Sequence, residues 1–555
     1  MRVDTIPEEN SSQKSSLEKS TKTEDVDYDH LLCAAGEFGR YQVWLFISTL
    51  PFYFFGAFTY FGQMFMTEIS PNHWCWIPEL ENLTAIERRT LYTGNWSSVL
   101  AGQPLDPTWA TTSCQHGWEF NKTEIPYPTI SSEMGWVCDK GSYQATAQSI
   151  FFVGSVVGGC LVGWLADRFG RLPAAVFSNV VGCVAGVASI YTTDFLQFAI
   201  CRFFVGISYD NCMMMVYLLV IEYVAPKYRT IIANLPFALF FTTAACVLPW
   251  IALACGHWKV ISLVVSVPMA LALLAPFMMP ESPRWLISKG RFDDAIQKAV
   301  DISKVNKKDI PPKLIEQFRK TAARTVQDKG TLIDIMKRPL LRRTFICITI
   351  NYSCCMLVFD ALLRTIGSLQ FDFFLSFTVI SLTECPSLML ISFILDITGR
   401  KLLTLISLGS CALFAILTVV VGSGLPSVLC SVAARFAVNM ACNTSMQWTA
   451  EILPTPVRGF GMSIIHICGF TATMISPFIV LLNVYVYWLP LVIIGAIAII
   501  GALVSLWLPE SANKEMPQTF DDAEEMVRSS KLFDLPRKNK PLPSSSDQEN
   551  ISFEN

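Results

Sequence analysis

Long apolar blocks separated by short polar segments dominate the chain. A helix needs about 20 consecutive apolar residues to cross the hydrocarbon core of a bilayer. Twelve blocks meet this length, and they run near residues 43–66, 142–165, 172–192, 197–221, 230–254, 259–279, 344–364, 371–395, 402–422, 425–449, 460–484 and 487–508. The pattern predicts an all-α membrane protein with twelve transmembrane helices.

The composition supports a membrane location. Hydrophobic residues make up 52% of the chain and charged residues only 16%, whereas a soluble protein averages about 25% charged residues. Lys and Arg number 42 against 45 Asp and Glu, so no basic excess points to a nucleic-acid partner. The first 40 residues are polar and do not resemble a cleavable signal peptide, so the first span is expected to direct insertion.

Two connections between the apolar blocks are long, and they differ in charge. Residues 67–141 carry four Lys or Arg, whereas residues 281–343 carry sixteen. Because cytoplasmic loops are enriched in basic residues, residues 281–343 are predicted to be cytoplasmic and residues 67–141 extracellular. Both termini are then cytoplasmic.

The extracellular connection carries candidate modification sites. Three N-x-S/T acceptors are predicted to be glycosylated on this side of the membrane; they are Asn82, Asn95 and Asn121. Cys75, Cys114 and Cys138 lie in the same connection, in an oxidising setting. Two of these three cysteines are expected to form one disulfide, and the sequence does not decide which two.

The two halves of the chain repeat at one offset of 229 residues. It relates Asp167 to Asp396, Glu222 to Glu451, Arg229 to Arg458, and the P-E-S segment at 280–282 to the one at 509–511. Four features in one register predict two six-helix bundles, related as a parallel repeat about an axis along the membrane normal.

This repeat also sets the expected domain boundaries. We expect a cytoplasmic tail at 1–40, a first bundle at 41–280 that includes the loop 67–141, a cytoplasmic helical linker at 281–343, a second bundle at 344–510 and a disordered cytoplasmic tail at 511–555.

Charged residues at the cytoplasmic ends of the predicted helices are candidates for a conformational gate. They are Asp167, Arg171, Glu222, Arg229, Asp396, Arg400, Glu451 and Arg458. Salt bridges between the two bundles at this end would stabilise an outward-open state and break as the cytoplasmic side opens. The alternative is that these charges only anchor loops and set the topology, but their shared register in both halves favours a gate.

Several short motifs resemble the major facilitator superfamily. They are D-R-F-G-R at 167–171, G-R-K at 399–401 and P-E-S-P-R-W-L at 280–286. The long loop after the first span, together with segments 37–42, 217–229 and 449–458, resembles the organic cation, carnitine and organic anion transporter family within it. The resemblance implies the fold of that superfamily, alternating access to a central cavity, and a solute carrier of the plasma membrane.

Ionisable residues inside membrane spans are costly and mark candidate functional sites. Three acids, Asp210, Asp360 and Glu384, lie in spans that the resemblance places around the cavity. A carboxylate can pair with an ammonium group, and each aromatic face over that group adds about 0.5–2 kcal/mol. The candidate partners are Tyr217, Phe241, Tyr352, Phe359 and Phe470, with Asn443 as a further polar residue of the cavity.

Each of these candidates has a simpler alternative. The aromatic residues would then only pack against helices or lipid. The acids would pair with a nearby arginine, as Asp360 would with Arg364 four residues further along one helix face. Arg202, Arg435 and His466 are the other ionisable residues within the spans.

The resemblance also bears on the charge of the substrate. It implies an acid in span eleven for carriers of cations and a basic residue a few positions further on for carriers of anions. Phe470 and Leu482 occupy these positions here, and negative charge is found instead at Asp210 and Asp360. The prediction is a monomeric secondary transporter of small organic cations or zwitterionic amines, which the membrane potential alone could drive.

Three other functions stay open at this point: a carrier of organic anions or carnitine-type solutes, a carrier-like receptor or scaffold that does not transport, and an enzyme. The chain has no G-x-x-x-x-G-K-[ST] nucleotide loop. Its five histidines suggest neither a metal site nor a catalytic triad. We therefore expect no enzyme activity, no cofactor and no metal, and the expected partners are the lipid bilayer and a small organic amine.

Overall fold

The computed structural model describes residues 27–70, 72–84, 87–88, 114–322, 332–368, 371–422, 424–512, 514 and 516–530. Within these residues the protein is almost entirely helical. Eleven helical stretches are long and apolar enough to cross a membrane, and a shorter apolar helix, α27 (Leu489–Ser505), follows them. The twelve-helix fold predicted from hydropathy is confirmed, with a shorter last helix.

The first half contains six spans, and four of them consist of two helices. They are α3 (Arg40–Ser48) with α4 (Leu50–Thr67), α8 (Ser142–Phe169), α9 (Arg171–Ala188), α10 (Phe195–Tyr209) with α11 (Asn211–Ile221), α12 (Pro226–Pro236) with α13 (Thr242–Cys255), and α14 (Trp258–Ser266) with α15 (Ala275–Met278). Asp210 lies at the junction of α10 and α11, where its backbone keeps helical angles (φ −75°, ψ −38°). The fourth span therefore passes through Asp210 near its middle.

The second half follows the same order of spans. They are α20 (Pro339–Arg364), α21 (Phe373–Leu382) with α22 (Glu384–Thr398), α23 (Arg400–Val421), α24 (Leu425–Ile452), α25 (Arg458–Thr473) with α26 (Ser476–Leu481), and α27. Between the halves lie α16 (Pro283–Ser288), α17 (Phe292–Asn306), α18 (Pro312–Ala322) and α19 (Leu332–Lys337).

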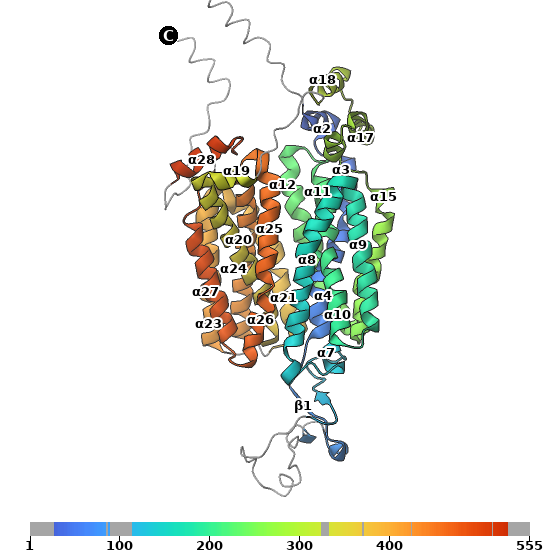
Figure 1. Cartoon of the computed structure of the whole chain (residues 1–555), viewed down its shortest axis with the longest axis vertical. Helices are drawn as coiled ribbons and strands as arrows, with labels where there is room; N and C mark the ends of the chain where they lie inside the picture. The colour runs from blue at the N-terminus through green and yellow to red at the C-terminus, as the bar shows by residue number, and fades with distance from the viewer. Residues whose placement is uncertain are drawn as a thin grey trace, which may run out of the picture.

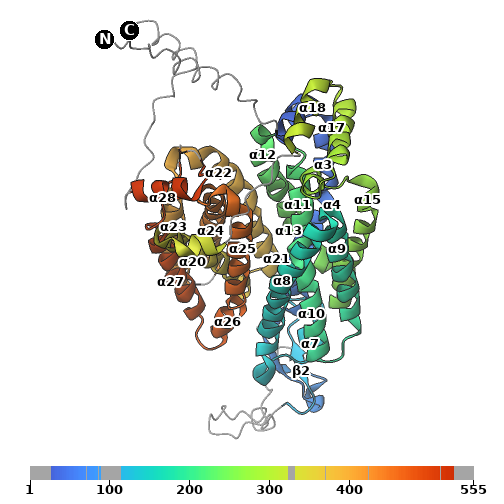
Figure 2. The ribbon, with the colours of Figure 1, turned by 45° about the horizontal axis from the view of Figure 1, so that its top comes forward.

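The two halves form two bundles that lie side by side, and they stay separate in both ribbon views (Figures 1 and 2). The helices α17, α18, α2 (Tyr28–Gly36) and α28 (Phe520–Ser529) lie at one end of the molecule. The elements β1 (His73–Cys75) and α7 (Ile130–Glu133) lie at the opposite end. The long loop of the first half therefore projects away from the basic linker, as their difference in charge predicts.

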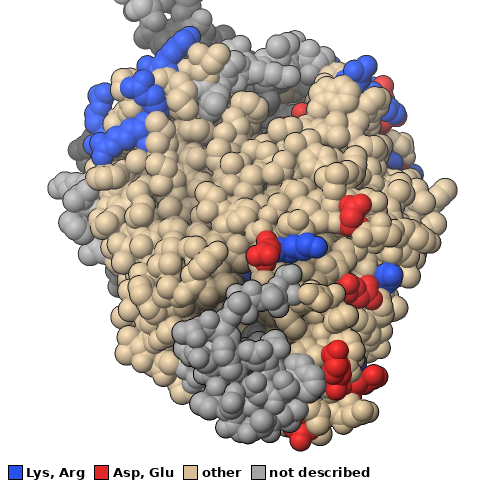
Figure 3. Space-filling model, turned by 60° about the horizontal axis from the view of Figure 1, so that its bottom comes forward, with Lys and Arg blue, Asp and Glu red and all other residues tan. Residues whose placement is uncertain are grey.

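The face around the long loop carries little charge. Where the structure describes it, this face is largely uncharged, with scattered acidic side chains and a few basic ones beside them (Figure 3). The sixteen Lys and Arg of residues 281–343 thus lie in the linker rather than in the long loop.

Glycines let two helices of the first bundle approach each other closely. A Cβ atom on Gly154 of α8 would lie 2.0 Å from the carbonyl oxygen of Phe203 of α10. A Cβ atom on Gly206 of α10 would lie 2.0 Å from the carbonyl oxygen of Phe151. Small residues at helix crossings permit such backbone contact in membranes, where packing rather than water exclusion drives association. The helix α8 therefore packs tightly against α10, the helix that ends next to Asp210.

The described part of the long loop is built around a two-stranded antiparallel sheet of β1 and β2 (Trp118–Phe120). A disulfide joins Cys75 to Cys114, and Cys138 is a free, exposed thiol. The structure thus selects one of the three pairings that the sequence leaves open. Of the predicted glycosylation sites, Asn82 is exposed, Asn121 is half-buried directly after β2, and Asn95 lies outside the described residues.

Thiol labelling provides a check on this pairing and on the topology. A membrane-impermeant maleimide applied to intact cells is expected to label Cys138 and to reach Cys75 and Cys114 only after reduction, because a disulfide sulfur does not react. Labelling is measured on the purified protein by mass spectrometry, before and after reduction.

Two variants provide the controls for that experiment. Cys138→Ser is expected to lose labelling of the loop before reduction, whereas Cys33→Ser, which removes an exposed thiol at the opposite end, is expected to keep it. Labelling of Cys75 or Cys114 in the unreduced Cys138→Ser protein would contradict the pairing.

Candidate functional site

The P-E-S segments of the two halves make the same contacts at the end of the molecule where the basic linker lies. The carboxylate of Glu281 accepts hydrogen bonds from the backbone N–H groups of Arg171 and Leu172, at 2.8 and 3.2 Å. Glu510 accepts two such bonds, at 3.0 Å each, from the first two residues of α23. A carboxylate at a helix N-terminus satisfies free N–H groups and complements the helix dipole. Each glutamate thereby fastens the end of its half to the third helix of that half.

The candidate gate residues of the first half pair within their own bundle. Arg171 donates to Asp167 at 2.9 Å. Glu222 accepts a hydrogen bond from the Ser282 hydroxyl of the P-E-S segment. These contacts hold helix ends of one bundle together.

Arg229 has a partner that the sequence did not indicate. It donates two hydrogen bonds to the Asp29 carboxylate of α2, at 2.6 and 3.1 Å, and Arg284 contacts the same carboxylate at 2.9 Å. Burial alone would raise the pKa of Asp29, but the hydrogen bonds and charges of Arg229 and Arg284 outweigh it, and the pKa lies below its ordinary value. Asp29 therefore stays ionised and holds α2 against the bundle. Its only signal in the sequence was an acid in an otherwise polar N-terminal segment.

The gate residues of the second half behave in the same way. Arg400 donates to Asp396 at 2.9 Å and to Glu451 at 2.8 Å. Arg458 donates to the backbone carbonyls of Leu453 and Pro517. Within the described part of the chain, no salt bridge at this end joins the first half to the second. Among the described residues, this conformation does not contain the cross-bundle bridges expected for an outward-open state.

Direct contacts between the bundles lie toward the end of the molecule that carries the long loop. The Tyr60 hydroxyl of α4 donates to Asp360 of α20 at 2.5 Å, and the Ser149 hydroxyl of α8 donates to the carbonyl of Met474 at 2.7 Å. A cluster of phenylalanine rings adds to this closure: Phe377 of α21 lies 5.3 Å from Phe61 and 4.9 Å from Phe65, between ring centroids. The conformation is thus held together on the side of the long loop.

Asp360 is completely buried, and three side chains donate hydrogen bonds to its carboxylate. Arg364 donates two hydrogen bonds to its carboxylate, at 2.7 and 3.0 Å, and the hydroxyls of Tyr60 and Ser476 donate to it as well. The pairing with Arg364 that the sequence offered as an alternative is the one that the structure contains. Asp360 therefore links three spans and has no free charge for a cation.

Glu384 is also paired with an arginine. Arg435 of α24 contacts its carboxylate at 3.0 Å and donates to the carbonyl of Phe359. The guanidinium carbon of Arg435 lies 3.4 Å from the centroid of the Phe359 ring. Both Glu384 and Phe359, two candidates for binding an amine, are therefore occupied by Arg435.

Asp210 differs from the other two acids. In the described structure no arginine lies within salt-bridge distance of it; its partner is His466 of α25, with 3.5 Å between Oδ2 and Nδ1. The side chains of Asp210 and His466 remain 15% and 18% exposed, although both lie within membrane spans. Their contact joins the first bundle to the second. Asp210 is thus an acid within a membrane span whose side chain stays partly exposed and whose partner is a histidine.

Aromatic rings surround the Asp210–His466 pair. Phe470 lies 4.8 Å from His466 and 5.7 Å from Tyr209, between ring centroids. Tyr352 lies 6.0 Å from His466, and Tyr60 stacks on Tyr209 at 4.8 Å. Four spans from both bundles supply these rings. Tyr352 and Phe470 were predicted for the site, whereas Tyr60 and the contact of His466 were not.

Three other predicted site residues have different neighbours. Tyr217 and Phe241 both contact the Phe237 ring, and the Asn443 amide donates to the carbonyl of Asn439 at 2.8 Å. In the described structure none of the three makes a ring contact or hydrogen bond with the Asp210–His466 pair.

Known proteins resemble this chain along most of its length. The family model of the sugar (and other) transporters matches residues 107–521. The chain is 28% identical to "Organic cation transporter 1" of Caenorhabditis elegans, with 90% of this chain and 89% of that protein covered. It is 25% identical to "Organic anion transporter 3" of Oryctolagus cuniculus, with 93% and 97% covered.

The fold also matches solved structures. The major facilitator superfamily proton:xylose symporter XylE superimposes with a TM-score of 0.59 at 15% sequence identity, covering 88% of this chain and 99% of that one. This likeness concerns the fold. Because the relatives are named for a cation and for an anion, the charge of the substrate has to be argued from the residues of this chain.

Proposed function

The chain belongs to the sugar (and other) transporter family, and on that premise we propose that it carries a small organic cation or a zwitterionic amine across the plasma membrane. The observation that carries the proposal is Asp210, a partly exposed carboxylate at the boundary of the two bundles that has no arginine partner among the described residues. Around it lie the rings of Tyr209, Tyr352 and Phe470, as an ammonium ligand requires.

The basic residues of the spans support a cation rather than an anion. Arg364 and Arg435 are each neutralised by an acid. Arg202 donates to Gln63 at 2.7 Å and lies 5.0 Å from the Phe151 ring centroid. One of its guanidinium nitrogens has no hydrogen-bond partner, which is the observation that favours an organic anion instead, but the side chain is buried inside the first bundle.

Binding at Asp210 would couple the substrate to the contact between the bundles. An ammonium group that pairs with Asp210 competes with His466 for the same carboxylate. Each aromatic face over the ammonium adds about 0.5–2 kcal/mol. The substrate would thus replace a cross-bundle contact with its own, which changes the relative stability of the inward- and outward-facing states.

We assign the ends of the molecule as follows. The end with the basic linker faces the cytoplasm, together with both chain termini, and the loop with Cys75–Cys114 faces outward. On the return to the outward-open state, Tyr60 and Asp360 separate at the outer end. The charged residues at the inner ends, among them Arg229 and Arg458, then form contacts across the bundles.

A voltage-dependent flux tests the proposal. Moving one positive charge through 100 mV changes its free energy by about 2.3 kcal/mol, so about 60 mV, inside negative, is expected to raise the equilibrium accumulation of a monovalent cation about tenfold. Uptake of radiolabelled tetraethylammonium into proteoliposomes, with a potassium gradient and valinomycin setting the potential, measures this.

An organic anion provides the control for that experiment, because its charge is opposite to that of the proposed substrate. We expect p-aminohippurate, an organic anion, to show no saturable uptake by the same proteoliposomes. Saturable p-aminohippurate uptake without tetraethylammonium uptake would contradict the cation site and favour the anion alternative that Arg202 suggests.

A further inference from the structure

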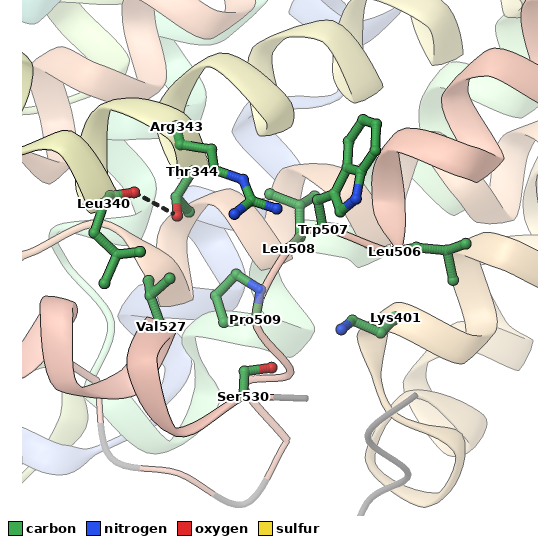
Figure 4. Close-up of a pocket in the computed structure, with 10 residues that line it drawn as sticks. All are labelled: Leu340, Arg343, Thr344, Lys401, Leu506, Trp507, Leu508, Pro509, Val527 and Ser530. Atoms are coloured by element: carbon green, nitrogen blue, oxygen red, sulfur yellow. Dashed lines mark hydrogen bonds between the residues drawn. The ribbon is translucent and has the colours of Figure 1, made fainter. Parts of the chain in front are cut away.

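A group of buried polar side chains in the first bundle lacks hydrogen-bond partners. Buried polar groups are normally satisfied, as Thr344 is at the small cavity of the second bundle in Figure 4, where its hydroxyl donates to the carbonyl of Leu340 at 3.1 Å. In the described structure, one guanidinium nitrogen of Arg202, the amide nitrogen of Gln63 and both amide atoms of Gln148 have no such partner. These three residues are 3%, 1% and 2% exposed, so bulk water does not satisfy them.

The three side chains come from the first, second and fourth spans and meet between them. The Nε of Arg202 on α10 donates to the Oε1 of Gln63 on α4 at 2.7 Å. The guanidinium carbon of Arg202 lies 5.0 Å from the centroid of the Phe151 ring on α8. Gln148 precedes Phe151 by three residues, so the two share one face of α8. Gln148 thus lies one helical turn from the ring that the guanidinium covers.

The packing of α8 against α10 places the amide of this glutamine close to the level of the guanidinium. A Cβ atom on Gly154 would lie 2.0 Å from the carbonyl oxygen of Phe203, and one on Gly158 would lie 2.4 Å from that of Ile207. The two helices therefore run in the same direction, at an offset of 49 residues. At this offset the glutamine lies opposite residue 197, before the arginine in the chain. Because helical side chains point toward the N-terminus, the long arginine side chain reaches back toward this level.

The charge of Arg202 is not balanced by an acid. Arginine stays protonated in proteins, and a buried charge is costly unless it is paired. In the described structure no Asp or Glu contacts Arg202, and the charged group that acts on it is the guanidinium of Arg364, a like charge. Arg171, Arg400 and Arg435 also have one nitrogen without a partner, but each forms a salt bridge with an acid.

We propose that Arg202, Gln63 and Gln148 bind one chloride ion inside the first bundle. The guanidinium and the amide nitrogens all donate N–H groups, which suit a spherical anion. The ion supplies the negative charge that the arginine lacks and joins α4, α8 and α10. The close approach of α8 and α10 at Gly154 and Gly206 favours a monatomic ion over an organic anion.

A chloride ion at this place would account for the arginine that otherwise favours an anionic substrate. Arg202 lies eight residues before Asp210 on the fourth span, about two helical turns away. The ion would neutralise the arginine there and leave the Asp210–His466 pair free for a cation. The inference goes beyond the proposed function, and its test uses no organic cation, so either can fail without the other.

Binding of radiolabelled chloride to the purified full-length protein, in gluconate buffer, tests the proposal. The unmodified protein is expected to bind one chloride ion at physiological chloride concentration. Arg202→Gln is expected to bind it at least about tenfold more weakly, because the charge is lost. Gln148→Leu keeps the charge and is expected to bind about threefold more weakly, because one donor is lost. Arg168→Gln, which changes an exposed arginine at the far end of α8, is expected to bind like the unmodified protein.

Melting temperatures guard against a folding defect. Replacement of chloride by gluconate is expected to lower the melting temperature of the unmodified protein, because a ligand of the folded state stabilises it, and to leave that of Arg202→Gln unchanged. If Arg202→Gln does not fold, Gln148→Leu decides, and unchanged binding there would overturn the site.

Three other results would also overturn it. They are no chloride binding by the unmodified protein, which would leave water to satisfy these groups, an equal loss of binding in Arg168→Gln and Arg202→Gln, and displacement of chloride by p-aminohippurate at equal concentration. The last result would make the group an organic-anion site.

Discussion

Asp210→Asn is expected to lower kcat/KM for uptake of an organic cation by at least about 100-fold, which corresponds to about 2.7 kcal/mol. The amide keeps the shape of the side chain but removes the negative charge that pairs with the ammonium group. His466, the present partner of Asp210, would not replace that charge. Initial rates of tetraethylammonium uptake, corrected for the amount of transporter in the membrane, give the effect.

Two further variants separate charge from structure at this position. Asp210→Glu is expected to recover part of the uptake, because it restores the carboxylate one methylene further out. Asp139→Asn, the same change at an exposed residue beside Cys138, is expected to transport like the unmodified protein. Normal uptake by Asp210→Asn would reject the carboxylate as the cation site.

Arg364→Met is expected to lower the free energy of unfolding by about 3–5 kcal/mol, because removal of one partner from a buried ion pair leaves the other charge uncompensated. The remaining charge is on Asp360, which is 0% exposed. The Tyr60 and Ser476 hydroxyls would still donate to it, but neither carries a positive charge. The melting temperature of the purified protein measures the loss.

The Arg364→Met experiment has an internal control and an external one. The double variant Asp360→Asn/Arg364→Met removes both charges and is expected to recover most of the lost stability. Lys320→Met breaks an exposed pair with Glu316 at the same i,i+4 spacing on α18, and no measurable change is expected there. A double variant no more stable than Arg364→Met alone would argue against a charge effect.

The sequence predicts the architecture well because the bilayer restricts it. Apolar blocks of about 20 residues have few alternatives to a spanning helix, and the offset of 229 residues relates the two bundles without any knowledge of their contacts. The P-E-S segments at 280–282 and 509–511 repeat in that register, and the structure gives both the same capping role. Their role depends on local geometry that the sequence does not state.

The candidate site was harder to predict, because it depends on which helices face each other. Asp360 and Arg364 are four residues apart, so their pairing could be considered from the sequence. Glu384 and Arg435 are 51 residues apart in the chain, and only the packing of α22 against α24 brings them together. All three acids were candidates for the cation site in the sequence. In the structure Asp360 and Glu384 each pair with an arginine, which leaves Asp210 as the candidate.

Residues that come from both bundles were the least predictable. Tyr60 and Asp360 are 300 residues apart, and His466 meets Asp210 across the boundary between the bundles. His466 had a weak signal as the one histidine within a predicted span, whereas Tyr60 was one aromatic among many in its span. No local sequence pattern predicts such pairings, because they depend on the orientation of one bundle relative to the other.

Glu281 and Glu510 have a further consequence for energy. Each fastens the last part of its bundle to the third span of that bundle, so we expect each bundle to move as one unit when the molecule changes state. The free-energy difference between the two states would then be set by the contacts between the two bundles. A ligand that binds one state about 5.5 kcal/mol more tightly than the other moves such an equilibrium from 1:99 to 99:1. The binding of one small substrate can supply a difference of this size.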